Sequence, residues 1–333
     1  MAVRADERIH DIGFVLLPGF ALMSFAAASE PYRAANILAE RALYRVRCFG
    51  ETCDVVQSSS GAEIPAEPLK AALGARLDTV MVCAGGRPSE WDRPAIHAAL
   101  RRLALQGVRI GGISGGPYVL AAAGLLKARD FTIHWEHAAA LIEAFPELRP
   151  RPARFVIDRD RLTCGGGVTP LDMAHALIAE RLGSDFARRV SDWFLHTEIG
   201  ASAAPQRASL AERYGVHHPA LLSVIETMEA TVEAPLGRQA MAELAGISVR
   251  QLDRLFAAHR GTSFGAEYKR IRLAHAARLL RQSALSVAEI AFATGFASPA
   301  HFSRAFRMAY GHAPSAARRR GTFSGVEYSS LQR

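Results

Sequence analysis

The sequence predicts two domains: an α/β domain with a parallel sheet flanked by helices, followed by an all-α domain with two helix-turn-helix motifs. The chain of 333 residues is longer than one ordinary domain. Across residues 10–200, short apolar runs alternate with helical patterns, which is typical of a parallel sheet covered on both faces. Residues 201–216 begin with small and polar residues and are expected to form a linker. Only helical patterns occur in residues 217–320.

The strands and helices of the first domain follow from the spacing of its apolar residues. Apolar runs bounded by Gly or Pro predict strands, and longer amphipathic stretches predict helices. The expected strands are Asp11–Leu17, Tyr44–Phe49, Thr79–Cys83, Arg109–Ile113, Phe155–Asp158 and Leu162–Cys164. The expected helices are Met23–Glu40, Pro94–Gln106, Tyr118–Leu126 and Thr169–Leu182.

The second domain contains two pairs of short helices, each joined by a tight turn. The pairs span residues 238–260 and 286–310, and a long amphipathic helix lies between them. Such a pair is the plan of a helix-turn-helix motif, and two of them would enter successive major grooves of DNA about 34 Å apart. The expected helices are Arg238–Gly246, Val249–Arg260, Phe264–Arg281, Val287–Thr294 and Pro299–Tyr310, with Ser248, Ser286 and Ser298 as N-caps.

The excess positive charge of the chain is concentrated in this second domain. From Pro205 onward there are 17 Lys and Arg against 9 Asp and Glu, and the residues before it hold 23 of each. A basic domain beside a neutral one indicates a partner such as nucleic acid, with a solvated basic surface as the alternative.

Polar residues on the outer face of the motifs are the candidates for contact with double-stranded DNA. Arg and Gln side chains pair with base edges, and Arg also binds phosphates; the alternative for each is a solvated surface position. The aromatic residues Phe296, Phe302 and Phe306 are expected to pack inward instead. The candidates are Arg238, Arg250, Gln251, Arg254, Arg278, Ser298, His301, Arg304 and Arg307.

The second domain resembles the AraC/XylS family of transcription activators over roughly residues 221–319. The most specific stretch is residues 287–314, which read VAEIAFATGFASPAHFSRAFRMAYGHAP. The positions that match the family signature are Ala291, Gly295, Phe296, His301, Phe302, Arg304, Phe306, Gly311 and Pro314. The resemblance implies a DNA-binding regulator of transcription, with RNA polymerase as a further partner.

The sharpest feature of the first domain is the glycine-rich segment Gly111–Pro117. Residues 112–116 fit the pattern G-x-S-x-G, a tight strand-to-helix turn that exposes Ser114 at the edge of the sheet. Ligands of open α/β sheets bind at this edge, where backbone N–H groups of a helix N-terminus are available. Gly85 and Gly86, which follow another strand, are expected to form the facing wall.

The first domain resembles the DJ-1/PfpI group of the class I glutamine amidotransferase-like superfamily from about Ile12 to Leu195. That resemblance implies a flavodoxin-like sheet with a cysteine nucleophile at the elbow, where this chain has Ser114. The resemblance implies that His134 corresponds to the histidine of the group. The early glutamate of the group would fall near Ser24 and is missing.

Three interpretations of Ser114 remain open at this point. As a hydrolase nucleophile it would need His134 as base, oriented by Glu136 or Asp130. As part of a ligand pocket it would offer one hydrogen bond among backbone donors. It could also be a purely structural turn. Because a hydroxyl replaces a thiol and the acidic partner is lost, the sequence predicts a binding pocket and no enzyme; the alternative is a hydrolase or amidotransferase-like catalyst with a DNA-binding appendage.

The segment Thr132–His137, which looks strand-like, suggests the chemistry of a ligand. Trp135 and Glu136 would offer an aromatic and anionic wall to a cationic nitrogen compound, unless Trp135 packs in the core and Glu136 is solvated. A metal site at His134, Glu136 and His137 lacks further ligands, and no metal or other cofactor is expected. The expected pocket residues are Gly85, Gly86, Ser114, Gly115, His134, Trp135 and Glu136.

The order of the two domains resembles the GlxA-like regulators, and within them the subgroup that responds to arginine, glycine betaine or carnitine. The segments SEPYRAAN, IHWE and DRDRLTCGGG carry this likeness, at residues 29–36, 133–136 and 158–167. The resemblance implies an activator, expected as a homodimer, with a small nitrogenous effector.

The remaining features predict a cytoplasmic protein without a membrane segment. No run of eighteen apolar residues occurs, and residues 1–10 lack the apolar core of a signal peptide. The four cysteines are scattered without a C-x-x-C pair, as expected for reduced thiols.

Overall fold

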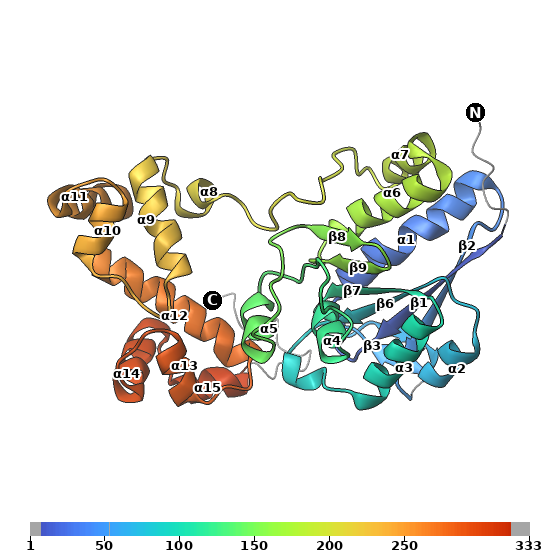
Figure 1. Ribbon diagram of the computed structural model, residues 1–333, viewed down its shortest axis with the longest axis horizontal. Helices are drawn as coiled ribbons and strands as arrows, with labels where there is room; N and C mark the ends of the chain where they lie inside the picture. Colours follow the sequence, from blue (N-terminus) through green and yellow to red (C-terminus); the bar gives the residue numbers. More distant parts are fainter. Residues whose placement is uncertain (1–7, 53, 321–333) are drawn as a thin grey trace, which may run out of the picture. The chain divides into compact units, whose positions relative to one another are not determined.

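The computed structural model describes residues 8–320 except Cys53 and divides into two compact units between Gln206 and Arg207. Figure 1 shows an α/β unit followed by an all-helical one. The expectation for residues 1–7 of the N-terminus lies outside the described residues. None of the helices in the described residues is long and apolar enough to cross a membrane. The thiols of Cys48, Cys83 and Cys164 are free.

The first unit is built on a seven-stranded sheet with the order β5-β2-β1-β6-β7-β9-β8. All neighbours in it are parallel except the terminal hairpin β8-β9, and β3 and β4 form a separate antiparallel pair. The strands are β1 (His10–Leu16), β2 (Tyr44–Gly50), β3 (Val55–Gln57), β4 (Glu63–Pro65), β5 (Glu67–Pro68), β6 (Thr79–Ala84), β7 (Arg109–Ser114), β8 (Phe155–Asp158) and β9 (Arg161–Cys164).

Helices cover both faces of this sheet and give the unit two hydrophobic cores (Figure 1). Phe14, Met81 and Met173 belong to the core under α1, α6 and α7, whereas Val82, Leu100 and Leu120 belong to the core under α2, α3 and α4. Strand β6 is buried along its whole length, which explains its unbroken apolar run. The helices are α1 (Leu22–Ala39), α2 (Leu69–Gly74), α3 (Pro94–Leu105), α4 (Gly116–Ala122), α5 (Ala138–Ala144), α6 (Thr169–Leu182) and α7 (Ser184–Trp193).

The segment expected to be a linker is docked on the first unit over its first six residues. Arg154 N donates to the carbonyl oxygens of Ser202 and Ala204, and Ala153 forms a β-bridge with Pro205. Further along, residues Leu210–Tyr214 form helix α8, which Ser209 and Glu212 open with a capping box.

The second unit contains helices in the described residues and no strands. Its helices after α8 are α9 (Pro219–Ala230), α10 (Arg238–Leu244), α11 (Val249–Arg260), α12 (Phe264–Gln282), α13 (Val287–Ala293), α14 (Pro299–Tyr310) and α15 (Pro314–Arg320). Ser248, Ser286 and Ser298 cap α11, α13 and α14 with their hydroxyls, as the sequence predicts. Gly295 has φ +70°, and a Cβ there would lie 2.6 Å from Cγ of Pro235, so this turn packs against the loop between α9 and α10.

Candidate functional site

The elbow at the end of β7 has the conformation that the glycine pattern predicts. Ser114 has φ 60°, in the left-handed region that favours glycine, and its side chain is 7% exposed. The chain then turns directly into α4. A Cβ on Gly112 would lie 2.6 Å from the backbone nitrogen of Pro117, and one on Gly116 would overlap the carbonyl oxygen of Val82. Both positions therefore require glycine.

Trp91 packs against the elbow beside Gly85 and Gly86. Its indole lies where a Cβ on Gly115 would be, and its Nε1 donates a hydrogen bond of 2.7 Å to the carbonyl oxygen of Gly85. Gly85 itself packs against the backbone at Gly19, and Gly86, with φ +78°, turns the chain beside Glu90. Gly85 directly follows Ala84, which pairs with Ser114 in the sheet and accepts a hydrogen bond of 3.0 Å from the backbone nitrogen of Gly115, so the two glycines begin beside the elbow.

His134 lies at the elbow but is not arranged as a base for Ser114. Its backbone nitrogen donates to the carbonyl oxygen of Ser114 (3.2 Å), and its Nδ1 accepts from the backbone nitrogen of Glu136 (3.3 Å). In the described residues, the Ser114 hydroxyl makes no hydrogen bond to the ring of His134. Burial lowers the pKa of His134, and nearby Glu136 opposes that shift only in part. His134 is therefore a neutral ring near neutral pH.

Ser24 occupies the other side of the elbow, where the sequence indicated a missing glutamate. Its hydroxyl accepts a hydrogen bond of 2.8 Å from the backbone nitrogen of Gly167. A Cβ on Gly166 would lie 2.8 Å from Cβ of Ser114 and 3.0 Å from Oγ of Ser24. The glycine run after β9 thus packs against both serines.

Trp135 and Glu136 lie in a turn before α5, so the strand-like interpretation of this segment was wrong. Trp135 is 38% exposed and Glu136 is half-buried, whereas the ring of His137 packs edge-on against Trp91 at 4.9 Å. Because the segment is a turn, the alternation of side chains along a strand cannot tell whether Trp135 or Glu136 faces the elbow. No cluster of His, Cys, Asp or Glu suited to a metal ion occurs in the described residues.

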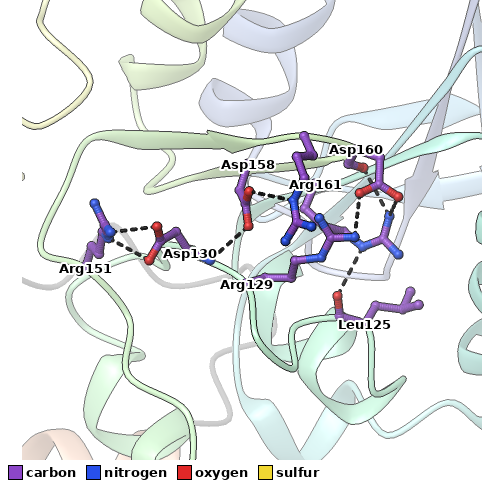
Figure 2. Close-up of polar contacts among 8 residues, drawn as sticks. Leu125, Arg129, Asp130, Arg151, Asp158, Asp160 and Arg161 are labelled. Carbon is purple, nitrogen blue, oxygen red and sulfur yellow. Dashed lines mark hydrogen bonds and ion pairs between the residues drawn. The ribbon is translucent and has the colours of Figure 1, made fainter.

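The chain that leads into this turn is held by charged residues of the β8-β9 hairpin, as Figure 2 shows. The backbone nitrogen of Asp130 donates to Asp158 (3.1 Å), and its carboxylate pairs with Arg151 (2.6 Å). Arg161 Nε donates to the carbonyl oxygen of Leu125 (3.1 Å). These contacts hold the backbone of the segment that precedes His134 and Trp135.

The candidate DNA-contact residues of the first motif lie on or beside α11. Arg250 and Arg254 are exposed on this helix. Gln251 has a structural role that the sequence analysis missed, since its Oε1 accepts from the backbone nitrogen of Ser248 (2.9 Å) in a capping box. The S-x-x-Q spacing was the signal for it. Arg238 pairs with Asp253 across the motif at 3.0 Å.

In the second motif, Arg304, Arg307 and His301 are exposed on α14, while Ser298 caps the helix. The expected inward packing is confirmed, because Phe296, Phe302 and Phe306 are each at most 3% exposed. Arg278 lies on α12, where its Nη2 contacts Nδ1 of His275 (3.2 Å).

One arginine that the sequence analysis missed stabilises the turn of this motif. Arg272 lies over the ring of Phe296 at 4.2 Å, and its Nε donates to the carbonyl oxygen of Thr294 (2.7 Å). The helical pattern of the sequence alone did not distinguish Arg272 from a solvent-exposed residue.

Comparison with known proteins agrees with both halves of this arrangement. Residues 15–180 match the DJ-1/PfpI family, and residues 241–320 match a helix-turn-helix domain family. The HTH-type transcriptional regulator GlxA of Rhizobium meliloti (strain 1021) is 59% identical over 96% of this chain and 99% of its own length. The chain belongs to the AraC-type transcriptional regulators with a DJ-1/PfpI domain.

Other members of this family are similar over most of the chain or over one domain. The HTH-type transcriptional regulator CdhR of Pseudomonas aeruginosa is 39% identical over 92% of this chain and 90% of its own length. A crystal structure of an AraC family transcriptional regulator from Pseudomonas putida is 31% identical, with a TM-score of 0.52, over 56% of this chain and 99% of that one. These relatives are named as regulators of transcription, in agreement with a DNA-binding regulator whose first domain is a DJ-1/PfpI domain.

Proposed function

We propose that this protein is a cytoplasmic transcriptional activator controlled by a small nitrogenous metabolite, an amino acid or quaternary amine, that binds at the elbow of the first unit. The observation that carries the proposal is the state of Ser114: it is held in the strained conformation of a nucleophile, yet its hydroxyl has no hydrogen bond to His134 among the described residues. A site with a hydroxyl at the position of the nucleophile, and no hydrogen bond from that hydroxyl to the nearby histidine, is suited to binding rather than to turnover.

The residues around the elbow suggest how such a ligand would be held. Ser114 and the backbone at Gly115 would supply hydrogen bonds, and neutral His134, whose Nδ1 accepts from Glu136, would donate one from Nε2. Trp135 and Glu136 would attract a cationic nitrogen through its charge. Gly85 and Gly86, which follow the strand paired with the elbow, would form part of the wall of the pocket.

For DNA recognition, we infer that α11 and α14 are the two recognition helices. The proposed contacts come from Arg250, Gln251 and Arg254 on α11 and from His301, Arg304 and Arg307 on α14, with Arg238, Arg278 and Ser298 at their margins. Arg238 would have to exchange its ion pair with Asp253 for a phosphate. A homodimer formed through the neutral first unit and a contact with RNA polymerase complete the proposed activator.

The DNA-binding proposal is tested by replacing one exposed arginine in each recognition helix. We expect Arg250→Ala and Arg304→Ala each to weaken binding to a DNA site selected from a random pool by about 1–3 kcal/mol if the arginine reads a base. A phosphate contact would instead lower the salt dependence of binding by about one unit of slope. Arg101→Ala, an exposed position on α3, is the control. Unchanged binding by the double variant would contradict the assignment.

The effector proposal is tested by thermal denaturation with glycine betaine, carnitine and L-arginine as probes. A ligand that binds only the folded state at one hundred times its Kd adds about 2.7 kcal/mol of stability, so it must raise the melting temperature of the first unit. We expect Ser114→Ala to reduce this shift and to leave DNA binding intact. No shift with any probe, together with ester or amide hydrolysis that Ser114→Ala abolishes, would favour the enzyme instead.

A further inference from the structure

We infer that Gln206, the last residue of the first unit, is a positioning residue for the elbow site and couples that site to the DNA-binding unit. The inference rests on the proposed function in one respect, because it assumes that the turn at residues 132–136 belongs to the effector site. Its structural basis is independent of which ligand binds there.

The side chain of Gln206 is inserted among the backbone groups of that turn. Its Oε1 accepts a hydrogen bond from the backbone nitrogen of Trp135 (2.8 Å). Its Nε2 contacts the carbonyl oxygens of Ile133 (2.9 Å) and Ala153 (2.7 Å) and the hydroxyl of Thr132 (2.9 Å). One amide thus links the backbone of Ile133 and Trp135 in the turn to Thr132 and Ala153.

The same side chain reaches the elbow from a second direction. A Cβ on Gly165 would lie 2.7 Å from Cδ of Gln206, and a Cβ on the next residue, Gly166, would lie 2.8 Å from Cβ of Ser114. Gln206 therefore packs on the glycine run that also touches the elbow serine. A displacement of either the turn or the glycine run would move Gln206 or break its hydrogen bonds.

Gln206 is also the outer end of the docked segment, which we call the tie (residues 196–206). The inner end of the tie is held by Asp172, whose carboxylate accepts from Nε2 of His196 (2.7 Å) and from the backbone nitrogen of Gly200 (2.8 Å). Asp172 is fully buried and also pairs with Arg154 (2.5 Å). The inner end of the tie is therefore held by several polar contacts. At its outer end, Gln206 is the last docked residue before the second unit, which begins at Arg207.

Coupling between two sites must act in both directions. If effector binding at the turn changes how firmly Gln206 is docked, then an event in the second unit that pulls on Arg207 must change the stability of the turn. DNA binding is such an event, and it is available as a probe without knowledge of the effector.

The experiment is backbone amide hydrogen exchange of the full chain with and without a DNA site selected from a random pool. In the wild-type protein, we expect DNA to change the exchange rates of residues 131–137 by about fivefold or more. In Gln206→Ala, these amides should exchange faster without DNA and should no longer respond to it. Gln106→Ala, which removes an exposed glutamine after α3, should behave like wild type.

A second variant keeps the first unit intact in case Gln206→Ala does not fold. Four residues, Gly-Ser-Gly-Ser, are inserted between Arg207 and Ala208, so that DNA binding no longer pulls on a docked Gln206. The response of residues 131–137 to DNA should again disappear. An unchanged exchange rate in wild type on DNA binding, or an equal response in either variant, would overturn the coupling. Failure of the effector proposal would appear separately, as the absence of a thermal shift with the ligand probes.

Discussion

At the scale of single residues, Asp172 shows how much one buried carboxylate can hold together. Its oxygens accept hydrogen bonds from Arg154, His196 and the backbone of Gly200. We predict that Asp172→Ala lowers the free energy of unfolding of the first unit by about 3–5 kcal/mol, because it leaves the partly buried Arg154 guanidinium without its counter-charge. Urea unfolding monitored by tryptophan fluorescence measures this loss of free energy, since all three tryptophans lie in the first unit.

The matched control is a salt bridge of similar geometry at the surface. Glu67, whose side chain is 45% exposed, pairs with Arg47 at 2.5 Å. Glu67→Ala should cost less than about 1 kcal/mol, because water screens an exposed pair. An equal loss in the two variants would show that burial does not decide the contribution of Asp172.

The elbow glycines give a prediction based on steric overlap. A Cβ on Gly116 would overlap the carbonyl oxygen of Val82 in the neighbouring strand. Gly116→Ala should therefore destabilise the first unit by more than about 4 kcal/mol or prevent its folding. Gly74→Ala at the end of α2, where no atom lies within 4 Å of the added Cβ, should have little effect. Tryptophan fluorescence of the soluble protein and the yield of folded chain would measure both.

Residues whose role depends on neighbours in sequence could be predicted, and residues whose role depends on distant contacts could not. The elbow conformation of Ser114 and the caps at Ser248, Ser286 and Ser298 follow from local glycine and serine patterns. The positions of Trp91 against Gly115 and of Gln206 against the turn bring together segments far apart in the chain. The periodicity of hydrophobic residues in the sequence carries no information about such long-range contacts.

At the scale of elements, helix α12 carries a half-buried histidine that should make the second unit sensitive to acid. Burial lowers the pKa of His275 to about 4, and the charge of Arg278 adds to the shift. Between pH 6.5 and pH 4 the unfolded chain binds a proton that the folded chain does not. We predict that the second unit is at full stability above pH 6.5 and loses up to about 3 kcal/mol as the pH falls to 4.

The measurement is thermal denaturation of the full chain by far-UV circular dichroism across this pH range. His275→Gln keeps a polar side chain of similar size but does not titrate, so its second unit should lose less stability in acid. If wild type and variant show the same pH dependence, groups other than His275 are responsible.

Elements also differ in how well they could be predicted. The boundaries of α11 and α14 agree with the sequence analysis, because strong caps and an amphipathic pattern define them. Helices α2 and α5, each of at most 7 residues, were missed because so short a pattern has no clear period. The turn at residues 132–137 was taken for a strand because its alternation imitates one.

At the scale of the whole molecule, the two units have separate hydrophobic cores. Tyr214, Leu252 and Phe256 belong to a core formed within the second unit alone. We predict that urea unfolding is not two-state: tryptophan fluorescence reports the first unit only, so its transition should not coincide with that from circular dichroism. Coincident transitions for the wild-type chain would show that the units unfold together.

The docked tie also has a consequence for the length of DNA that the protein can span. Six residues follow Gly200 up to Gln206, and once undocked they could span at most about 20 Å in total. At about 3.4 Å for each base pair, this reach corresponds to roughly six base pairs. A dimer with docked ties would accept a narrow range of half-site spacings, and one with released ties would accept a wider range. Docking of the tie, to which Gln206, Arg154 and Ala153 contribute, would thereby limit the half-site spacings that such a dimer can occupy.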